Sequence, residues 1–444
     1  MGHLRKRDLE TLLGDPPPQA NRRRGGRQVR HLLSGCAECA SRLFHSTAEE
    51  DAVYDACIDR AWQAVHNGED FWREEREKRD QYLELVRAKG WDKLTRKERD
   101  SCPDGWACVE VLLAVCFESR YRDPRQMLRL ARQARFAAEK LDPELYGKRR
   151  LADLQARTWA ELGNALRVNE QFDKVRDALS RARVLLVEKG TGDLLIQAYI
   201  DQVEGSFWKD QRYLRDAEDL LASACRKYLR IGECHLAGRA LVTRGLNRII
   251  DGQPWEAVAY LRQAVALLDA ERDPELIETA QHNLLFALAD AGEYREASEL
   301  LLRSGLRQKF VDDPLNLLRL RWVEAKILAG HGRFEAAEKA LSEVRGAFRI
   351  RRLELVATIA GLDLAKILFQ QGKLAQLYRL VRELRVAAEA YRLPGSVSQA
   401  LATLEVMCQV RNVTLAMVEA VQRFFQRLQH NPRLSWDPEL ILLR

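Results

Sequence analysis

The sequence predicts an all-α protein: a right-handed α-solenoid of helix pairs with a 40-residue period, preceded by a small helical N-terminal unit. Two observations lead to this fold class. Hydrophobic residues make up 46% of the 444 residues and charged residues 31%, and glycine and proline fall mostly between periodic segments, which is typical of packed helices. In addition, a turn followed by an amphipathic helix recurs at a constant interval.

The recurring pattern is centred on a small or apolar anchor residue, which a leucine or valine usually follows four positions later. The Ala257 copy continues with Leu261 and Ala264, so these three side chains form one stripe along a helix. A single helix pair cannot bury such a stripe, so neighbouring pairs are expected to stack. Five anchors recur at the constant interval: Ala217, Ala257, Ala297, Ala337 and Leu377. An earlier copy is centred on Val175 and a weaker one on Ala131.

Glycines and Asp-Pro pairs predict where the helices end and begin. A glycine five residues before four of the anchors is expected to close the first helix of a pair in a left-handed conformation (Gly252, Gly292, Gly332 and Gly372). Asp-Pro supplies an N-cap followed by the first helical residue. Such pairs stand at 123–124, 142–143, 273–274, 313–314 and 437–438.

One copy carries more of the pattern than the others. The segment Trp159-Ala-Glu-Leu-Gly-Asn164, followed by Phe172, Leu179 and Ala182, resembles a tetratricopeptide (TPR) repeat, although Val175 stands where alanine is usual. The resemblance extends over roughly residues 105 to 390. The period is 40 rather than the usual 34 or so, which predicts longer helices or loops. A HEAT-like repeat fits that length, but the turn with glycine, an aromatic residue and alanine favours the TPR class.

The TPR resemblance implies a concave groove, lined by the first helices, that binds a peptide or a partner helix. In the TPR register, residues 18, 15 and 11 positions before each anchor should line this groove. The set is basic and aromatic and therefore favours an acidic or amphipathic peptide. Its members are Arg157, Asn164, Tyr199, Gln202, Arg239, His282, Trp322, Lys326 and Lys366.

The first 30 residues form a basic, proline-interrupted segment that we expect to be a flexible tail. Its arginines are an arm for nucleic acid or an acidic protein surface on one interpretation, and a solvated tail on the other. They carry no interleaved aromatic residue for base stacking. The arginines are Arg22, Arg23, Arg24, Arg27 and Arg30.

A candidate zinc site follows the tail. His31, Cys36 and Cys39 offer an imidazole and two thiolates, which are ligands that zinc prefers. The segment resembles the zinc-binding domain of bacterial anti-sigma factors, but its His-to-Cys spacing is one residue longer. The alternative is a helical hairpin whose cysteines only pack. The fourth ligand is open among His45, Cys57 and His3.

These features divide the chain into five expected segments. A basic tail (1–30) precedes a zinc-finger-like helical unit (31–65) and a charged helical linker (66–104). The TPR-like solenoid (105–394) follows, and C-terminal capping helices (395–444) complete the chain.

Composition limits the remaining function classes. The net charge of +7 permits an acidic partner without demanding nucleic acid. No apolar run approaches the roughly 20 residues of a membrane helix, so no membrane association is expected. Nine irregularly spaced cysteines without an export signal predict reduced thiols and a cytoplasmic location.

No phosphate loop, His-Glu-x-x-His zinc site or nucleophile elbow is present, so we expect no enzymatic activity. The sequence instead predicts a protein-binding adaptor or regulator, which the anti-sigma resemblance links to bacterial transcription control. Two alternatives stay open: a nucleic-acid-binding regulator that uses the basic tail, and an architectural subunit of a larger assembly.

Overall fold

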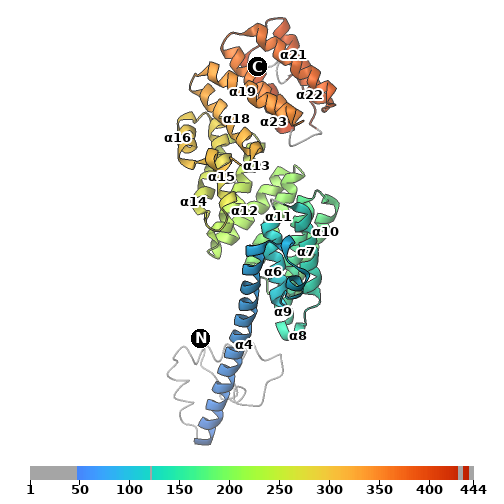
Figure 1. Cartoon of the computed structure of the whole chain (residues 1–444), viewed down its shortest axis with the longest axis vertical. Coiled ribbons are helices and arrows are strands. Elements are labelled where there is room, and N and C mark those ends of the chain that lie inside the picture. The colour runs from blue at the N-terminus through green and yellow to red at the C-terminus, as the bar shows by residue number, and fades with distance from the viewer. Residues whose placement is uncertain (1–47, 121–122, 429–433, 440–444) are drawn as a thin grey trace. The chain divides into compact units, whose positions relative to one another are not determined.

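The computed structural model describes residues 48–120, 123–428 and 434–439, and within these ranges it contains helices and turns but no β strand (Figure 1). The all-α prediction is therefore confirmed. The chain divides into a first unit that ends at Val111 and a second unit that begins at Leu112. Within the described ranges, no helix is both long enough and apolar enough to cross a membrane.

The first unit contains α4 (Ala48–Lys89), a short 3-10 turn (Trp91–Lys93), α5 (Arg96–Asp100) and the start of α6 (Trp106–Ser119). The 42-residue α4 is one continuous helix across the boundary expected at residue 65. A capping box begins α5, in which the Thr95 hydroxyl accepts from the Glu98 N–H and the Glu98 carboxylate accepts from the Thr95 N–H.

Helix α6 is held at its start by α4. The Glu75 carboxylate accepts a hydrogen bond from the Ala107 N–H at 2.9 Å, and the Trp72 and Trp106 rings meet edge to face at 5.0 Å. The Tyr82 hydroxyl donates to the Glu98 carbonyl at 2.8 Å and so holds α5 as well. These three contacts fix the loop between α5 and α6.

The second unit is a solenoid of consecutive helix pairs. Its helices are α7 (Pro124–Glu139), α8 (Pro143–Tyr146), α9 (Lys148–Val168), α10 (Phe172–Val184) with a π turn at Leu185–Lys189, α11 (Leu194–Asp210), α12 (Leu214–Arg230), α13 (Cys234–Ile250), α14 (Pro254–Leu267), α15 (Pro274–Ala291), α16 (Tyr294–Ser304), α17 (Leu306–Lys309), α18 (Pro314–Gly330), α19 (Phe334–Ile350), α20 (Glu354–Gln370), α21 (Leu374–Ala390), α22 (Gly395–Gln409) and α23 (Leu415–Leu428).

Helix length explains the long period. Both helices of the pair α11 and α12 have 17 residues, and a turn of only three joins them, so one helix with its turn fills half of the period. The predicted glycines occupy the turns within the pairs with positive φ: Gly252 at 72°, Gly292 at 83°, Gly332 at 73° and Gly372 at 69°. The prediction that glycine closes these first helices in a left-handed conformation is confirmed.

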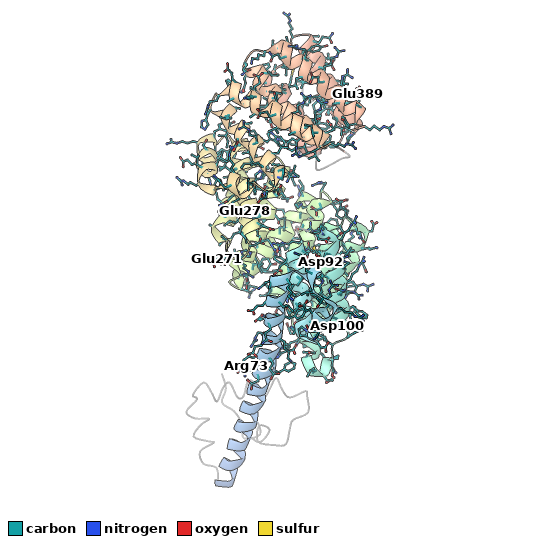
Figure 2. All side chains as sticks on the ribbon, viewed as in Figure 1. Arg73, Asp92, Asp100, Glu271, Glu278 and Glu389 are labelled. Carbon is teal, nitrogen blue, oxygen red and sulfur yellow. The ribbon has the colours of Figure 1, made fainter. Side chains whose placement is uncertain are left out.

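The anchors form the core between the helices. Ala217, Ala257, Ala297, Ala337 and Leu377 are all 0% exposed, as are Val175 and Ala131. Asp123, Asp142, Asp273 and Asp313 cap helices whose first residue is proline, as the Asp-Pro pairs predict. Charged side chains such as Glu271 and Glu389 are exposed on the surface of the repeats (Figure 2).

The last helix pair changes the order of packing. Helix α22 packs against α21, while α23 packs against α20, the first helix of the preceding pair. Trp436 is buried beside α23, with its ring 4.9 Å from that of Phe424, and its Nε1–H donates to the Thr403 hydroxyl at 3.1 Å. Helix α23 therefore lies on the side of the solenoid that the first helices line.

Candidate functional site: a polar cavity between the first helices

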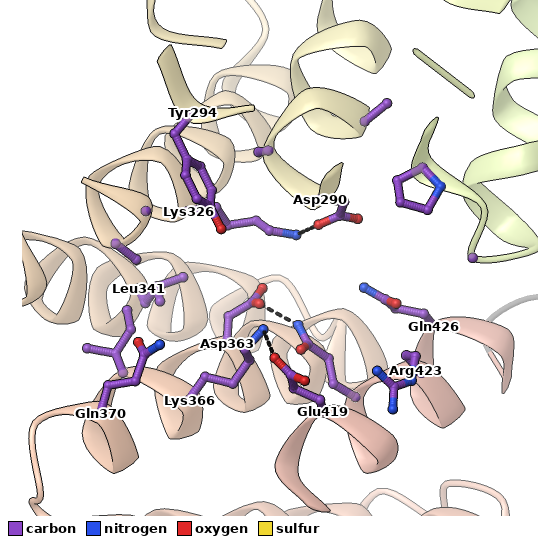
Figure 3. A pocket seen from close by; sticks show the side chains of 18 of the residues that line it. Asp290, Tyr294, Lys326, Leu341, Asp363, Lys366, Gln370, Glu419, Arg423 and Gln426 are labelled. Carbon is purple, nitrogen blue, oxygen red and sulfur yellow. Dashed lines mark hydrogen bonds and ion pairs between the residues drawn. The ribbon is translucent and has the colours of Figure 1, made fainter. Parts of the chain in front are cut away.

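A cavity of about 590 Å³ opens within the second unit (Figure 3). Helices α15, α18, α20 and α23 supply most of its walls, and the turns at Gly252 and Gly332 complete them. Its polar lining consists of three carboxylates, three cations, three glutamines and one tyrosine: Asp290, Asp363, Glu419, Lys326, Lys366, Arg423, Gln370, Gln422, Gln426 and Tyr294.

Two of the three cations are neutralised within the cavity. Lys326 forms an ion pair with Asp290 and also lies over the Phe286 ring, 4.5 Å from its centroid. Lys366 pairs with Glu419 at 3.1 Å. Burial raises the pKa of the Asp290 carboxyl more than Lys326 lowers it. Burial also opposes the charge on Lys326, but the carboxylates of Asp290 and Asp363 outweigh this and raise the pKa of Lys326.

The third carboxylate is held by neutral donors. Asp363 accepts a hydrogen bond from the Trp322 indole at 2.7 Å and another from the Gln422 side-chain amide. These bonds join α18, α20 and α23 at the floor of the cavity. Arg423 also lines the cavity, and its side chain is exposed. It is therefore the lining cation that is available to a ligand carboxylate.

Three of the predicted groove residues come together here. Lys326 and Lys366 line the cavity. Trp322 does not line it but donates a hydrogen bond to Asp363, which does. Lys326 and Lys366 lie 11 positions before their anchors, whereas Trp322 lies 15 positions before its anchor and is only 8% exposed. The two lysine side chains, 11 positions before their anchors, thus face the cavity. The Trp322 side chain, 15 positions before its anchor, packs between helices.

The other predicted groove residues lie elsewhere on the first helices. Asn164 contacts Tyr199 at 3.4 Å, and the Tyr199 hydroxyl donates to Glu161. Gln202 is buried and accepts a hydrogen bond from the Tyr228 hydroxyl at 2.9 Å. The remaining three are half-buried: Arg157 in α9, Arg239 in α13 and His282 in α15. The His282 ring lies 6.1 Å from that of Phe310.

The end of α6 contacts the same face of the solenoid near Arg239. The Arg120 guanidinium forms an ion pair with Asp273 at 2.6 Å, and Arg239 lies 3.8 Å from the same carboxylate. Both guanidinium groups lie over the Phe117 ring, at 3.6 and 4.3 Å from its centroid. This part of the first-helix face is therefore covered by the protein's own residues, whereas the cavity at α15, α18 and α20 is open.

Sequence reasoning found only two of the ten polar residues that line the cavity, Lys326 and Lys366. Asp290 and Gln370 lie seven positions before their anchors and Asp363 lies 14 before, so a wider choice of repeat positions would have found them. Glu419 and Arg423 come from α23, which lies outside the repeat, and no periodic signal marks them.

The candidate zinc ligands His31, Cys36 and Cys39 lie outside the described residues, as does the basic tail with Arg22, Arg23, Arg24, Arg27 and Arg30. Among the residues the structure describes, no cluster of three or more His, Cys, Asp or Glu side chains could hold a metal ion. Zinc binding at residues 31–39 and contacts by the tail stay predictions.

No protein-family model matches the sequence, and no curated protein matches it. Several solved structures are similar in fold. A Rap protein in complex with competence and sporulation factor is 13% identical with a TM-score of 0.50, and the match covers 76% of this chain and 94% of that one. The apo form of RapI (TM-score 0.47, 12% identity, 73% and 98% covered) and aspartyl phosphate phosphatase F from Bacillus subtilis (0.45, 13%, 76% and 88%) are also similar.

The similarity to the Rap protein confirms the fold class, a TPR-like α-solenoid. The wall of the cavity is rich in side chains that can form hydrogen bonds. Among the described residues that line it there is no serine, cysteine or histidine, and two of its three carboxylates are engaged by lysines. The amides of Gln370 and Gln426, together with Arg423, can donate hydrogen bonds to carbonyl and carboxylate oxygens.

Proposed function

We propose that the protein is a non-enzymatic regulator that binds a short peptide, or a peptide segment of a partner protein, in the cavity between α15, α18, α20 and α23. The observation that carries this proposal is the composition of the cavity wall. It combines the side-chain amides of Gln370 and Gln426 with the exposed Arg423, while the Gln422 amide is bound to Asp363. Amide side chains can pair with a peptide backbone, which presents both donors and acceptors.

The charge distribution favours a peptide with a carboxylate over nucleic acid. Lys326 and Lys366 are each paired with an acidic side chain, so the wall carries no continuous basic stripe for a phosphate backbone. The Arg423 guanidinium can bind one carboxylate of the peptide, either an acidic side chain or the C-terminus. The similar Rap protein was crystallised with competence and sporulation factor, which supports a binding role for this fold.

A displayed library of random peptides, selected on the immobilised full-length protein, tests the proposal. Enriched peptides are synthesised, and their affinities are measured for the wild type and for Arg423→Glu. We expect enriched peptides to contain a carboxylate, and the substitution to weaken their binding about tenfold or more, since every 1.4 kcal/mol or so lost is tenfold in Kd.

Arg382→Glu is the matched control, because Arg382 is an exposed arginine of α21 that does not line the cavity. Its affinity for the selected peptides should equal that of the wild type. Equal binding to Arg423→Glu, or a library from which no peptide is enriched, would refute the proposal. The basic-tail alternative predicts instead that binding to nucleic acid is lost on removal of residues 1–30.

A further inference from the structure

Two cysteines face one another where α6 begins. The Sγ atoms of Cys102 and Cys108 lie 3.8 Å apart. Both side chains are partly exposed, so a small dissolved oxidant can reach them. The two residues lie at the ends of a short connection that contains Pro103 and Gly105, and Gly105 has a positive φ of 79°.

The surroundings of the pair differ for the two sulfurs. Cys108 is the third residue of α6, at the N-terminus of a 14-residue helix, where the helix dipole favours a negative charge. The hydrogen bond from the Cys102 thiol lowers the pKa of Cys108. The same bond, together with burial, raises the pKa of Cys102. Cys108 is therefore the nucleophile of the pair and Cys102 the proton donor.

We propose that Cys102 and Cys108 are a reversible oxidation site that forms an intramolecular disulfide. A disulfide requires an S–S distance of about 2 Å, so the sulfurs must approach by a little less than 2 Å. The loop between them can supply that movement, because Cys102 lies outside both α5 and α6.

A peroxide is the oxidant class that balances the reaction. The Cys108 thiolate attacks one peroxide oxygen, the O–O bond breaks, and the leaving oxygen departs as hydroxide or alkoxide and takes up a proton, which leaves a sulfenic acid on Cys108. Cys102, as its thiolate, then attacks that sulfur, and the S–O bond breaks with loss of water once the oxygen is protonated. A thiol reductant such as reduced glutathione or reduced thioredoxin reverses the oxidation by exchange.

The position of the pair gives the oxidation a structural consequence. The helices on either side of this loop are held by Glu75 and Tyr82 of α4, which bond to the Ala107 N–H of α6 and the Glu98 carbonyl of α5. Pulling Cys102 towards α6 alters these contacts. We therefore expect the disulfide to change hydrogen exchange in α5 and in the first turn of α6.

The full-length chain, with Cys36 and Cys39 replaced by serine to remove the Cys-x-x-Cys pair, is equilibrated in glutathione buffers of increasing oxidation. Trypsin releases residues 100–120, and cleavage before Asp104 separates Cys102 from Cys108. A disulfide keeps residues 100–103 joined to 104–120. Fragmentation of the joined peptide assigns the bond to Cys108 or to the buried Cys116.

We expect the Cys102–Cys108 bond to form in the folded chain with an equilibrium constant about tenfold higher than in urea, because the fold holds the two sulfurs together. Cys102→Ser and Cys108→Ser should abolish it, and Cys234→Ser, which removes an exposed cysteine of α13, should not. Thiols that stay reduced across the whole series, a bond to Cys116 instead, or an equal constant in urea would each overturn the proposal. If a variant fails to fold, the comparison of the folded and urea-unfolded chain with Cys102 and Cys108 intact still tests the proposal.

Discussion

Lys326 on α18 forms an ion pair with Asp290 on α15, so the first helices of two successive pairs are joined by opposite charges at the edge of the cavity (Figure 3). The two side chains are 11% and 22% exposed. Because neither side chain is fully hydrated, each charge is stabilised by the opposite charge of its partner.

The losses caused by the two single substitutions should overlap, because each removes the same ion pair. Lys326→Met leaves the Asp290 carboxylate partly buried without its cation, and we expect unfolding free energy to fall by about 3 kcal/mol. In the double variant with Asp290→Asn, the loss should be smaller than the sum of the two single losses by about 1 kcal/mol or more. Urea unfolding of all four proteins measures this; additive losses would show that the pair contributes no coupling.

Stability should fall on mild acidification because of His282. Burial lowers the pKa of its imidazole from 6.5 to about 4, and its Nε2 is buried without a hydrogen-bond partner. Because the unfolded chain takes up a proton near pH 6.5 and the folded chain does so only near pH 4, stability is lost as the pH drops through this window. This group should lower the unfolding free energy by about 2 kcal/mol between pH 7 and pH 5.

His282→Leu is the variant that isolates this effect. Between pH 7 and pH 5 the unfolding free energy of this variant should fall less than that of the wild type, and the difference should be about 2 kcal/mol. An unchanged pH dependence in the variant would show that other groups cause the loss.

Gly245 of α13 should not tolerate a methyl group. A Cβ at this position would lie 2.5 Å from Cγ of Leu261 in α14, closer than carbon atoms can approach. We expect Gly245→Ala to destabilise the protein by about 1–3 kcal/mol, because the two helices must separate. Gly346→Ala is the matched control in α19, where a Cβ meets nothing within 4 Å; it should stabilise by about 0.5–1 kcal/mol. Thermal unfolding of both variants checks the opposite signs.

The sequence resemblance of residues 31–39 predicts about one zinc ion per chain. Elemental mass spectrometry of protein purified without chelator measures it, with Cys36→Ser, Cys39→Ser as the comparison. Metal that is lost in the variant would support the zinc site and, with it, the link to transcription control. Metal-free wild type would leave the N-terminal cysteines without that role.

The repeat could be predicted because its signals are local. Anchor residues such as Ala257 and Ala337 must be small to fit between helices, and Gly252 must adopt a positive φ, so both leave a mark at a fixed spacing. The period of 40 then follows from helices of 17 residues and short turns.

The cavity could be predicted only in part, because four of its ten polar lining residues come from α23, which lies outside the repeat. Lys326 and Lys366 follow from the repeat register. Glu419 and Arg423 reach the cavity only because α23 packs against α20, an arrangement that side-chain packing decides and that no sequence period records. For the same reason the contact between Arg120 and Asp273, far apart in the chain, has no signature in the sequence.

Site-specific cross-linking tests the central claim, that a peptide binds in this cavity, most directly. A photoreactive phenylalanine analogue replaces Gln426, which lines the cavity, or Gln409, which is exposed on α22 and does not line it. A peptide selected on the wild-type protein should cross-link to the protein with the analogue at 426 and not at 409, and excess unlabelled peptide should suppress the reaction. Cross-linking at 409 alone, or at neither position while the peptide still binds, would contradict the account.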